Sequence, residues 1–482
     1  MNDDKGSEAT RLMTTGGDGR LTLDPRTGLN RYHSAPRPSP VLAYASSTAN
    51  DISPAAFEHV RQIAAEFGTE LSGPLYAERL ELLRRRIRAA YRVADDVDVV
   101  FAPSGTDLEY VGLACVAGRG ANGTHNILLG ADEVGSGCIH SAYGRYFAES
   151  TAVGLATRAG EAVSGLGEVA LTDVPVRDAH GRARRSSDIS EEMLDHAMPA
   201  QRQGRHVLVH IVHGSKTGLI LPTLEDVDGL RERLGDGAGF VVDACQARIT
   251  SAAIADYLAR DAIVFVTGSK FMGGPPFSGF ALVPPAFRRN APPLPKGLAT
   301  IFRRSEWPFG WPGAEALENS ANPGLLLRLE ASIFELERFQ GLPGETAERV
   351  ILAFHRAVRD EIVGPTPARR VAPYPPGKKE TADTHPVEMR TLSTLDLSGL
   401  AGGHATFDDA TRWYKALLGH GVRLGQPVKC VRLEDGGWGA TLRIGLTMAQ
   451  VVERAALDDA TLSDRFAADM ARIRQALLAV AA

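Results

Sequence analysis

The chain has 482 residues, of which 44% are hydrophobic and 23% charged, with a formal net charge of −5. This length predicts a large and a small domain, and the acidic balance gives no reason to expect a nucleic-acid partner. The sequence lacks the run of about 18 apolar residues that a membrane-spanning helix needs, and its four cysteines are too widely spaced for a disulfide scaffold or a zinc site. Because of this cysteine spacing we expect no bound metal. The N-terminus is polar and has no apolar core like that of a secretion signal, so we expect a cytoplasmic protein.

The first two thirds of the chain are expected to form an N-terminal arm and a large domain. We expect residues 1–65 to be a partly disordered arm and residues 66–300 to be the large domain. The spacing of Leu, Ile and Ala predicts helices over 54–70 and 76–93. Continuous apolar runs then alternate with Gly-containing loops, as in DVDVVFA, THNILLG, RHVLVHIVH, GFVVDA, AIVFVT and GFALV. Such runs are typical of strands buried on both faces, so the sequence predicts an α/β fold with a mostly parallel sheet covered by helices.

Residues 301–482 are expected to form a smaller α+β domain with connecting helices. A Pro/Trp/Gly loop is followed by two amphipathic helices and a loop over 364–386. The rest of the predicted order is a strand in VEMRTLSTLDL, a helix around 406–419, a strand pair over 426–447 broken by DGGWG, and a C-terminal helix.

A lysine ends one of the predicted strands. Lys270 closes AIVFVTGSK and precedes FMGGPPFSG, whose glycines let the backbone approach a bound ring closely. A lysine at a strand end is suited to forming a Schiff base with an aldehyde cofactor. The alternative is a lysine on a surface loop, which is where most lysines lie.

An acidic residue ends the preceding strand. Asp243 follows the apolar run of GFVVDACQ, and a carboxylate there is costly to bury unless it has a partner such as a protonated ring nitrogen. Capping of the next turn is the alternative. Gln246, three residues later, is placed to reach an oxygen on the same ring.

A small-residue turn lies between an early strand and the following helix. Its residues are Ser104, Gly105 and Thr106. Exposed N–H groups at a helix start, together with two hydroxyls, suit a phosphate group, although SGTD is also a good helix N-cap. Thr267 and Ser269, which flank the lysine, offer two more hydroxyls.

A late strand carries an arginine. Arg443 lies in WGATLRIGLTM. A buried arginine needs an anionic partner, and a carboxylate is its natural bidentate mate. A salt bridge inside the protein is the alternative to a substrate carboxylate.

Taken in order, PSGTDLE, DACQ, TGSK and LRIGL resemble the motifs of the fold-type I enzymes that depend on pyridoxal 5'-phosphate (PLP), and within them the branch of class V aminotransferases and cysteine desulfurases. The resemblance covers residues 70–470. It implies a large domain with a mostly parallel sheet of the seven-stranded type, a smaller C-terminal α+β domain, and a homodimer with shared active sites.

The resemblance also implies a role for each matching residue. Lys270 is the Schiff-base lysine, Asp243 pairs with the pyridine nitrogen, and Gln246 contacts the 3'-oxygen. Arg443 holds the α-carboxylate of an amino-acid substrate. Ser215 falls where desulfurases carry an asparagine, and Val134 replaces a histidine that stacks on the ring. The remaining cofactor-binding positions are Thr267 and the phosphate-loop residues Ser104, Gly105 and Thr106.

Departures from the family pattern leave the reaction open. Ser269 stands where desulfurases have a histidine. His140 and Tyr143 are candidates to cover the ring, and Lys216 and His213 are candidates for substrate binding, with surface placement as the alternative.

We expect transamination, with Lys270 moving the α-proton. Elimination or replacement at the β- or γ-carbon of a sulfur-containing amino acid, in a specialised biosynthetic pathway, is the alternative. Cysteine desulfuration is less favoured, because Cys430 is predicted to lie inside a strand and a persulfide-forming thiolate needs an accessible loop. A catalytically silent binding protein is also less favoured, because the Lys/Asp/Arg set is intact.

Overall fold

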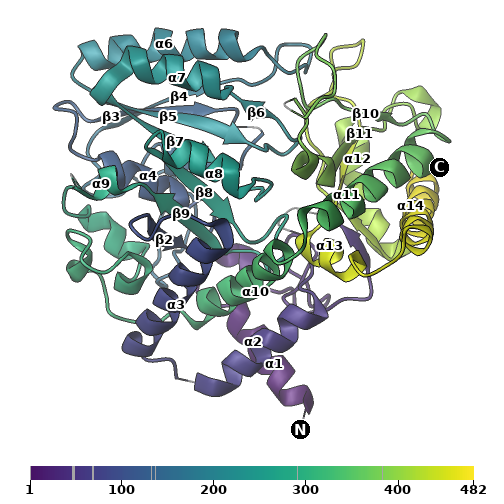
Figure 1. Ribbon diagram of the computed structural model, residues 1–482, viewed down its shortest axis with the longest axis horizontal. Coiled ribbons are helices and arrows are strands. Elements are labelled where there is room, and N and C mark those ends of the chain that lie inside the picture. The colour runs from purple at the N-terminus through teal and green to yellow at the C-terminus, as the bar shows by residue number, and fades with distance from the viewer. Residues whose placement is uncertain are drawn as a thin grey trace.

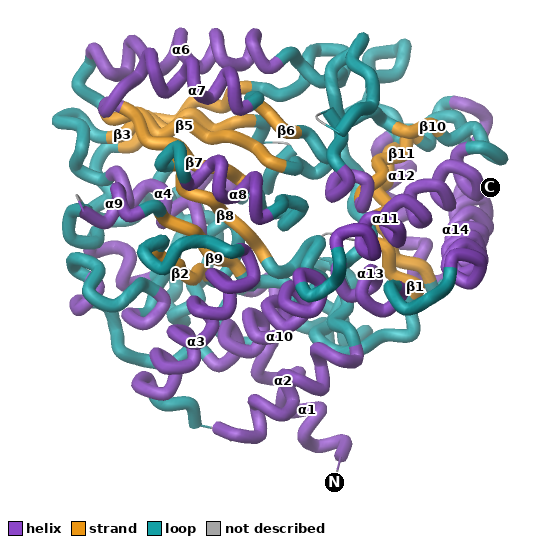
Figure 2. The backbone as a smooth tube through the Cα atoms, in the orientation of Figure 1, coloured by secondary structure: helices purple, strands orange, loops and turns teal. Residues whose placement is uncertain are grey.

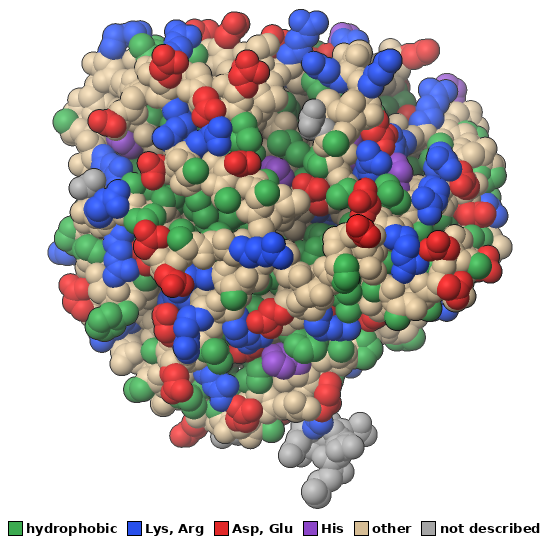
Figure 3. Space-filling model, in the orientation of Figure 1, with side chains coloured by type: hydrophobic (Ala, Val, Ile, Leu, Met, Phe, Trp, Pro, Cys, Tyr) green, Lys and Arg blue, Asp and Glu red, His purple; other side chains and the backbone are tan. Residues whose placement is uncertain are grey.

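The computed structural model describes residues 2–45, 49–67, 70–131, 133–135, 137–289, 291–382 and 384–482. A large part built around a central sheet lies beside a smaller part that contains the C-terminus (Figure 1). Helices surround the strands in both parts (Figure 2). Basic and acidic side chains are interspersed over the face of the molecule seen in Figure 3.

The central sheet confirms the predicted fold. Its main path runs β2 (Asp98–Ala102), β9 (Gly279–Val283), β8 (Ala262–Thr267), β7 (Ala238–Asp243), β5 (His206–His213), β3 (Thr124–Leu129) and β4 (Val169–Val174). Only β9 runs against the other strands of this path. A short strand, β6 (Ile220–Leu221), pairs antiparallel with β5. The burial of whole strands, such as all eight residues of β5, explains why the sequence shows continuous apolar runs.

Helices cover both faces of this sheet. One face packs against α3 (Gly73–Tyr91), α6 (Ser186–Arg202), α7 (Leu224–Leu234), α8 (Ser251–Leu258) and α10 (Pro323–Gln340). The other face packs against α4 (Leu108–Val116) and the segment 294–317. Strand β4 and helix α6 were not predicted from the sequence.

The smaller part has a core of its own. An antiparallel sheet of β10 (Arg369–Arg370), β11 (Leu392–Asp396) and β13 (Thr441–Gly445) packs with α11 (Gly344–Val358), α12 (Phe407–Ala416), α13 (Met448–Arg454) and α14 (Asp459–Ala481). The side chains of α10 belong to the large core and those of α11 to the small one. The domain boundaries at residues 65 and 300 stay a prediction.

Two segments of the smaller part differ from the prediction. Residues 387–391 form a 3-10 helix, so the strand begins only at Leu392. Residues 426–440 contain no continuous strand, because the chain there makes isolated bridges, such as Arg432 to Trp438, instead of a continuous ladder. Cys430 therefore lies outside a strand, contrary to the prediction, although it is buried.

The N-terminal segment packs against both parts. Helix α1 (Asn2–Met13) contacts α10 and α2 (Pro54–Phe67), and β1 (Leu42–Tyr44) pairs in parallel with β12 (Val422–Leu424) of the smaller part. The chain between α1 and β1 contributes Arg20 and Tyr32 to the lining of a cavity.

Candidate active site

A cavity of about 260 Å³ lies at the carboxyl ends of the parallel strands, where open α/β sheets bind ligands. Asp243 is the last residue of β7, and Lys270 follows the end of β8 by three positions. Arg443 reaches the cavity from β13 of the smaller part. Nine of the ten site residues predicted from the sequence line it: Ser104, Gly105, Thr106, Val134, Asp243, Gln246, Thr267, Lys270 and Arg443.

Ser215 is the predicted site residue that does not line this cavity. It is buried, and its hydroxyl donates to Oε2 of Glu133 at 2.8 Å. Glu133 also pairs with Arg177 at 2.6 Å. Ser215 thus helps to fix Glu133, the residue before Val134. A direct contact of Ser215 with a cofactor stays a prediction.

A second acidic residue near Asp243, Glu109 of α4, was not predicted from the sequence. The register of β5 on β7 pairs His210 with Val241, so Asp243, two residues along, is on the same face as His210. Glu109 of α4 approaches His210 with 3.5 Å between Oε2 and Nε2. Burial, and then the charge of Asp243, raises the pKa of Glu109, and burial lowers the pKa of His210 to about 4. Burial thus favours the neutral forms of both Glu109 and His210.

The loop around Lys270 is held by the backbone and by Asn50. The side-chain amide of Asn50 donates to the carbonyl oxygens of Ser269 at 3.1 Å and Lys270 at 2.5 Å. The N–H of Phe271 donates to the carbonyl of Gln246 at 3.2 Å. These bonds fix the lysine backbone relative to the DACQ segment, and no local pattern in the sequence marks Asn50.

Two of the hydroxyls predicted to lie near the phosphate already donate within the protein. Ser104 Oγ donates to Oδ2 of Asp107 at 2.6 Å, and Thr267 Oγ1 donates to the carbonyl of Cys245 at 2.6 Å. A Cβ on Gly105 would come within 2.9 Å of Thr267 Cγ2, so glycine lets this loop lie against the end of β8. A phosphate here would be held mainly by backbone N–H groups and by the hydroxyl of Thr106.

Gln246 is oriented by an arginine that the sequence analysis missed. Arg248 Nη1 donates to Gln246 Oε1 at 2.7 Å, and its Nε donates to Thr391 Oγ1 at 2.8 Å. Because the amide oxygen of Gln246 is taken, its NH₂ group is the part left to donate toward a ring oxygen.

Arg443 is only 2% exposed and lies beside the turn that carries Lys216. Its Nε donates to the carbonyl of Gln426 at 2.9 Å, and its Nη1 donates to the carbonyl of Lys216 at 3.3 Å. Burial lowers the pKa of Arg443 to about 10. Among the described residues no carboxylate lies within ion-pair distance of this guanidinium, so a substrate carboxylate is a fitting partner.

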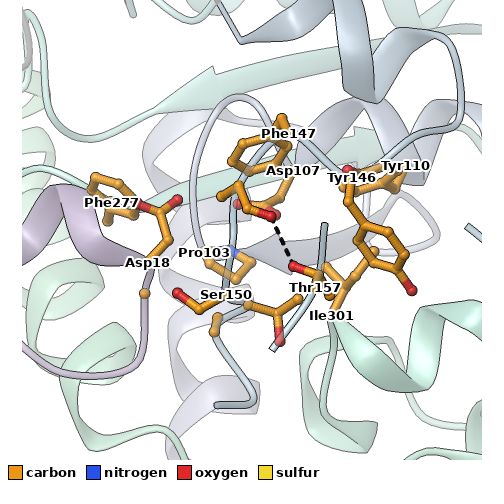
Figure 4. A pocket seen from close by; sticks show the side chains of 14 residues that line it. Asp18, Pro103, Asp107, Tyr110, Tyr146, Phe147, Ser150, Thr157, Phe277 and Ile301 are labelled. Atoms are coloured by element: carbon orange, nitrogen blue, oxygen red, sulfur yellow. Dashed lines mark hydrogen bonds between the residues drawn. The ribbon is translucent and has the colours of Figure 1, made fainter. Parts of the chain in front are cut away.

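The N-terminal segment supplies two cavity residues, Arg20 and Tyr32, although it was predicted to be a partly disordered arm. Arg20 is held by Asp18, with Nη2 and Oδ2 at 2.6 Å, and stacks on Phe277 with 4.5 Å between its Cζ and the ring centroid. Figure 4 shows an adjoining small hollow in which Asp18 lies between Phe277 and Asp107.

The remaining candidates lie apart from this cavity. His213 is buried against Tyr257, with 3.1 Å between Nδ1 and the hydroxyl oxygen. His140 and Tyr143 are exposed, and Cys430 does not line the cavity. No helix among the described residues is long and apolar enough to cross a bilayer, and their His, Cys, Asp and Glu side chains form no group of three that fits a metal ion.

The fold is that of the fold-type I PLP-dependent enzymes. A ureidoglycine–glyoxylate aminotransferase from Bacillus subtilis superimposes with a TM-score of 0.55 at 11% identity, over 91% of this chain and 92% of that one. A cysteine desulfurase from Escherichia coli gives 0.56 at 14% identity, over 91% and 95% of the two chains. A serine palmitoyltransferase from S. paucimobilis gives 0.50 at 14%, over 98% and 96%. No protein-family model and no curated protein matches the sequence.

Proposed function

We propose that this chain is a PLP-dependent enzyme that binds its cofactor at Lys270 and transfers the amino group of an amino-acid substrate. The observation that carries the proposal is the meeting of Lys270, Asp243 and Arg443 in one cavity, although they come from separate strands. The groups fit PLP chemically, since an amine, a carboxylate and a carboxylate-binding cation are what such a site requires.

Each residue has a defined task in this proposal. Bound PLP supplies an aldehyde carbon that bonds to amines and a ring that accepts electrons. Asp243 holds a proton at the ring nitrogen, and the NH₂ group of Gln246 donates to the 3'-oxygen. Arg443 holds the α-carboxylate, and the amine of Lys270 moves the proton at the α-carbon.

The solved structures with this fold support the choice of cofactor and reaction class. The Bacillus subtilis protein is an aminotransferase, and the serine palmitoyltransferase is described with a bound PLP–myriocin aldimine. Desulfuration is less favoured, because Cys430 is buried away from the cavity and burial raises the pKa of its thiol to about 12. We also propose that the chain forms a homodimer, as the sequence resemblance implies.

The visible absorption of the purified protein with added PLP tests the proposal. We expect a band that Lys270→Ala abolishes and that Lys296→Ala, at an exposed lysine, retains. An amino-acid substrate should convert the cofactor to pyridoxamine phosphate if the enzyme is an aminotransferase. Release of a keto acid and ammonia with PLP regenerated would instead favour elimination, and formation of a new amino acid with PLP regenerated would favour replacement. The absence of any band in the wild type would refute PLP binding.

A further inference from the structure

Arg20 is a cation that the N-terminal segment contributes to the lining of the cavity. Its Nε donates to Oδ1 of the buried Asp18 at 2.9 Å, and its Nη2 donates to Oδ2 at 2.6 Å. Its Nη1 donates to no acceptor among the described residues. One edge of the guanidinium is therefore fixed within the protein, and the other keeps a donor for a ligand.

Two aromatic rings hold the same guanidinium. The Cζ atom of Arg20 lies 4.9 Å from the ring centroid of Phe147 and 4.5 Å from that of Phe277. Cation–π contacts of this kind favour one position of the charged group. The ion pair with Asp18 and the two rings thus order the Arg20 side chain before any ligand arrives, which lowers the entropic cost of binding.

The ordered guanidinium lies beside the predicted phosphate loop. A Cβ on Gly137 would be 3.2 Å from Thr106 of this loop and 3.9 Å from the ring of Phe147, so Phe147 and Thr106 are neighbours. The charge of Arg20 also acts on Asp107, which directly follows the loop, because it opposes the rise in the pKa of Asp107 that burial causes. Contact geometry and charge therefore place Arg20 at the same end of the cavity as the loop.

The phosphate loop lacks charged and free hydroxyl donors of its own. The hydroxyls of Ser104 and Thr267 already donate to Asp107 and to the carbonyl of Cys245. Only the hydroxyl of Thr106 is left, and residues 104–106 include no basic side chain. A phosphate monoester carries about 1.5 to 2 negative charges at pH 7. A cation next to the loop would supply both the missing charge and a strong donor.

We propose that Arg20 binds the phosphate of PLP through Nη1, so that the N-terminal segment completes the cofactor site. This inference rests on the proposed function and adds a cofactor-binding residue to it. Asp18 acts as a positioning residue, since it holds the opposite edge of the guanidinium. Arg20 then discriminates between a phosphorylated ligand and one of the same shape without the phosphate, because only the former accepts its charge-assisted hydrogen bond.

A matched pair of aldehydes provides the test. The PLP-free protein is titrated with PLP and with 5'-deoxypyridoxal, which has a methyl group in place of the phosphate arm, and both dissociation constants are read from the visible spectrum. Both compounds can react with Lys270, so their difference reports on the phosphate alone. Inorganic phosphate is titrated in parallel by calorimetry, because its binding needs no reaction with the lysine.

The variant Arg20→Gln should raise the dissociation constant of PLP by roughly 10- to 100-fold, which is the effect of losing a charged hydrogen bond. The dissociation constant of 5'-deoxypyridoxal should change by less than about threefold. Binding of inorganic phosphate should weaken by roughly tenfold or more in the same variant. Arg26→Gln, at an exposed arginine of the same segment, is the matched control and should behave as the wild type.

The outcomes separate this inference from the proposed function. If Arg20→Gln weakens PLP and 5'-deoxypyridoxal equally, or weakens neither, the contact with the phosphate is overturned while PLP binding at Lys270 stands. A wild type that shows no visible band with PLP would overturn the proposed function. Inorganic phosphate would then still decide on Arg20: weaker binding in Arg20→Gln would support a phosphate site, and unchanged binding would contradict it.

Discussion

At the scale of single residues, Asp107 connects burial with cofactor binding. It is 7% exposed, accepts a hydrogen bond from Ser104, and directly follows the predicted phosphate loop. Burial raises its pKa to about 7, with the Ser104 hydrogen bond and Arg20 opposing the shift. A neutral Asp107 tolerates a phosphate beside it, whereas an ionised one repels it.

We therefore expect the affinity for PLP to fall as Asp107 loses its proton between about pH 6 and 8. The variant Asp107→Asn stays neutral throughout, so its affinity for PLP should fall less. Over this range the wild type should lose about 3 to 10 times more affinity than the variant. Fluorescence titration of the PLP-free protein at several pH values measures the difference. Asp188→Asn, at an exposed position of α6, is the control, and identical slopes for Asp107→Asn and the wild type would contradict the assignment.

At the scale of elements, one side chain of α10 holds the N-terminal segment in place. Arg328 is fully buried and donates to the carbonyls of Met13 at 2.7 Å, Thr15 at 2.6 Å, Gly16 at 3.0 Å and Phe277 at 2.7 Å. It thereby ties the end of α1 to the loop that carries Phe277. Arg20, four residues beyond Gly16, reaches the cavity from this anchored segment.

Replacing Arg328 by Met leaves these carbonyls without their donors. We expect the free energy of unfolding to fall by roughly 2–4 kcal/mol, and the N-terminal segment to become more sensitive to proteolysis. Urea denaturation and limited digestion measure the two effects. Arg356→Met, at an exposed site on α11, should change stability by less than about 0.5 kcal/mol. An Arg328→Met protein as stable as this control would show that the anchor is dispensable.

At the scale of the whole molecule, the proposed homodimer has a candidate contact surface next to the cavity. Helix α5 (Cys138–Ala142) begins at Cys138, which lines the cavity. Ile139 is 44% exposed and Tyr143 is 38% exposed, one helical turn apart. Neighbouring apolar side chains exposed in this way are typical of an interface.

The double variant Ile139→Asp, Tyr143→Asp should shift the protein from dimer to monomer, because two charges would be buried in the contact. Sedimentation velocity over a range of concentrations measures the shift. Leu478→Asp on α14, where the leucine is also 44% exposed, should leave the dimer intact. A wild type that sediments as a monomer at all concentrations would refute the dimer itself.

The fold and the centre of the site were predictable because they depend on order and local pattern. Parallel strands end at the same edge of a sheet, so Asp243 at the end of β7 and Lys270 after β8 had to meet once the strands were recognised. The strands that are buried on both faces were predicted from continuous apolar runs in the sequence. The sequence by itself therefore determined the α/β class and nine of the residues that line the cavity.

Only the tertiary structure decided which residues complete the site. Asn50 contacts Lys270 across 220 positions of sequence, and Arg248 reaches Thr391 across 143. The same holds for Arg20 and Tyr32, which lie in the segment predicted to be a partly disordered arm and line the cavity. No periodic pattern or motif in the local sequence marks the residues that make such contacts. The energy of these contacts depends on the hydrogen-bonding groups that distant elements bring to one place. Local sequence specifies helices and strands, whereas packing alone selects the neighbours of a functional group.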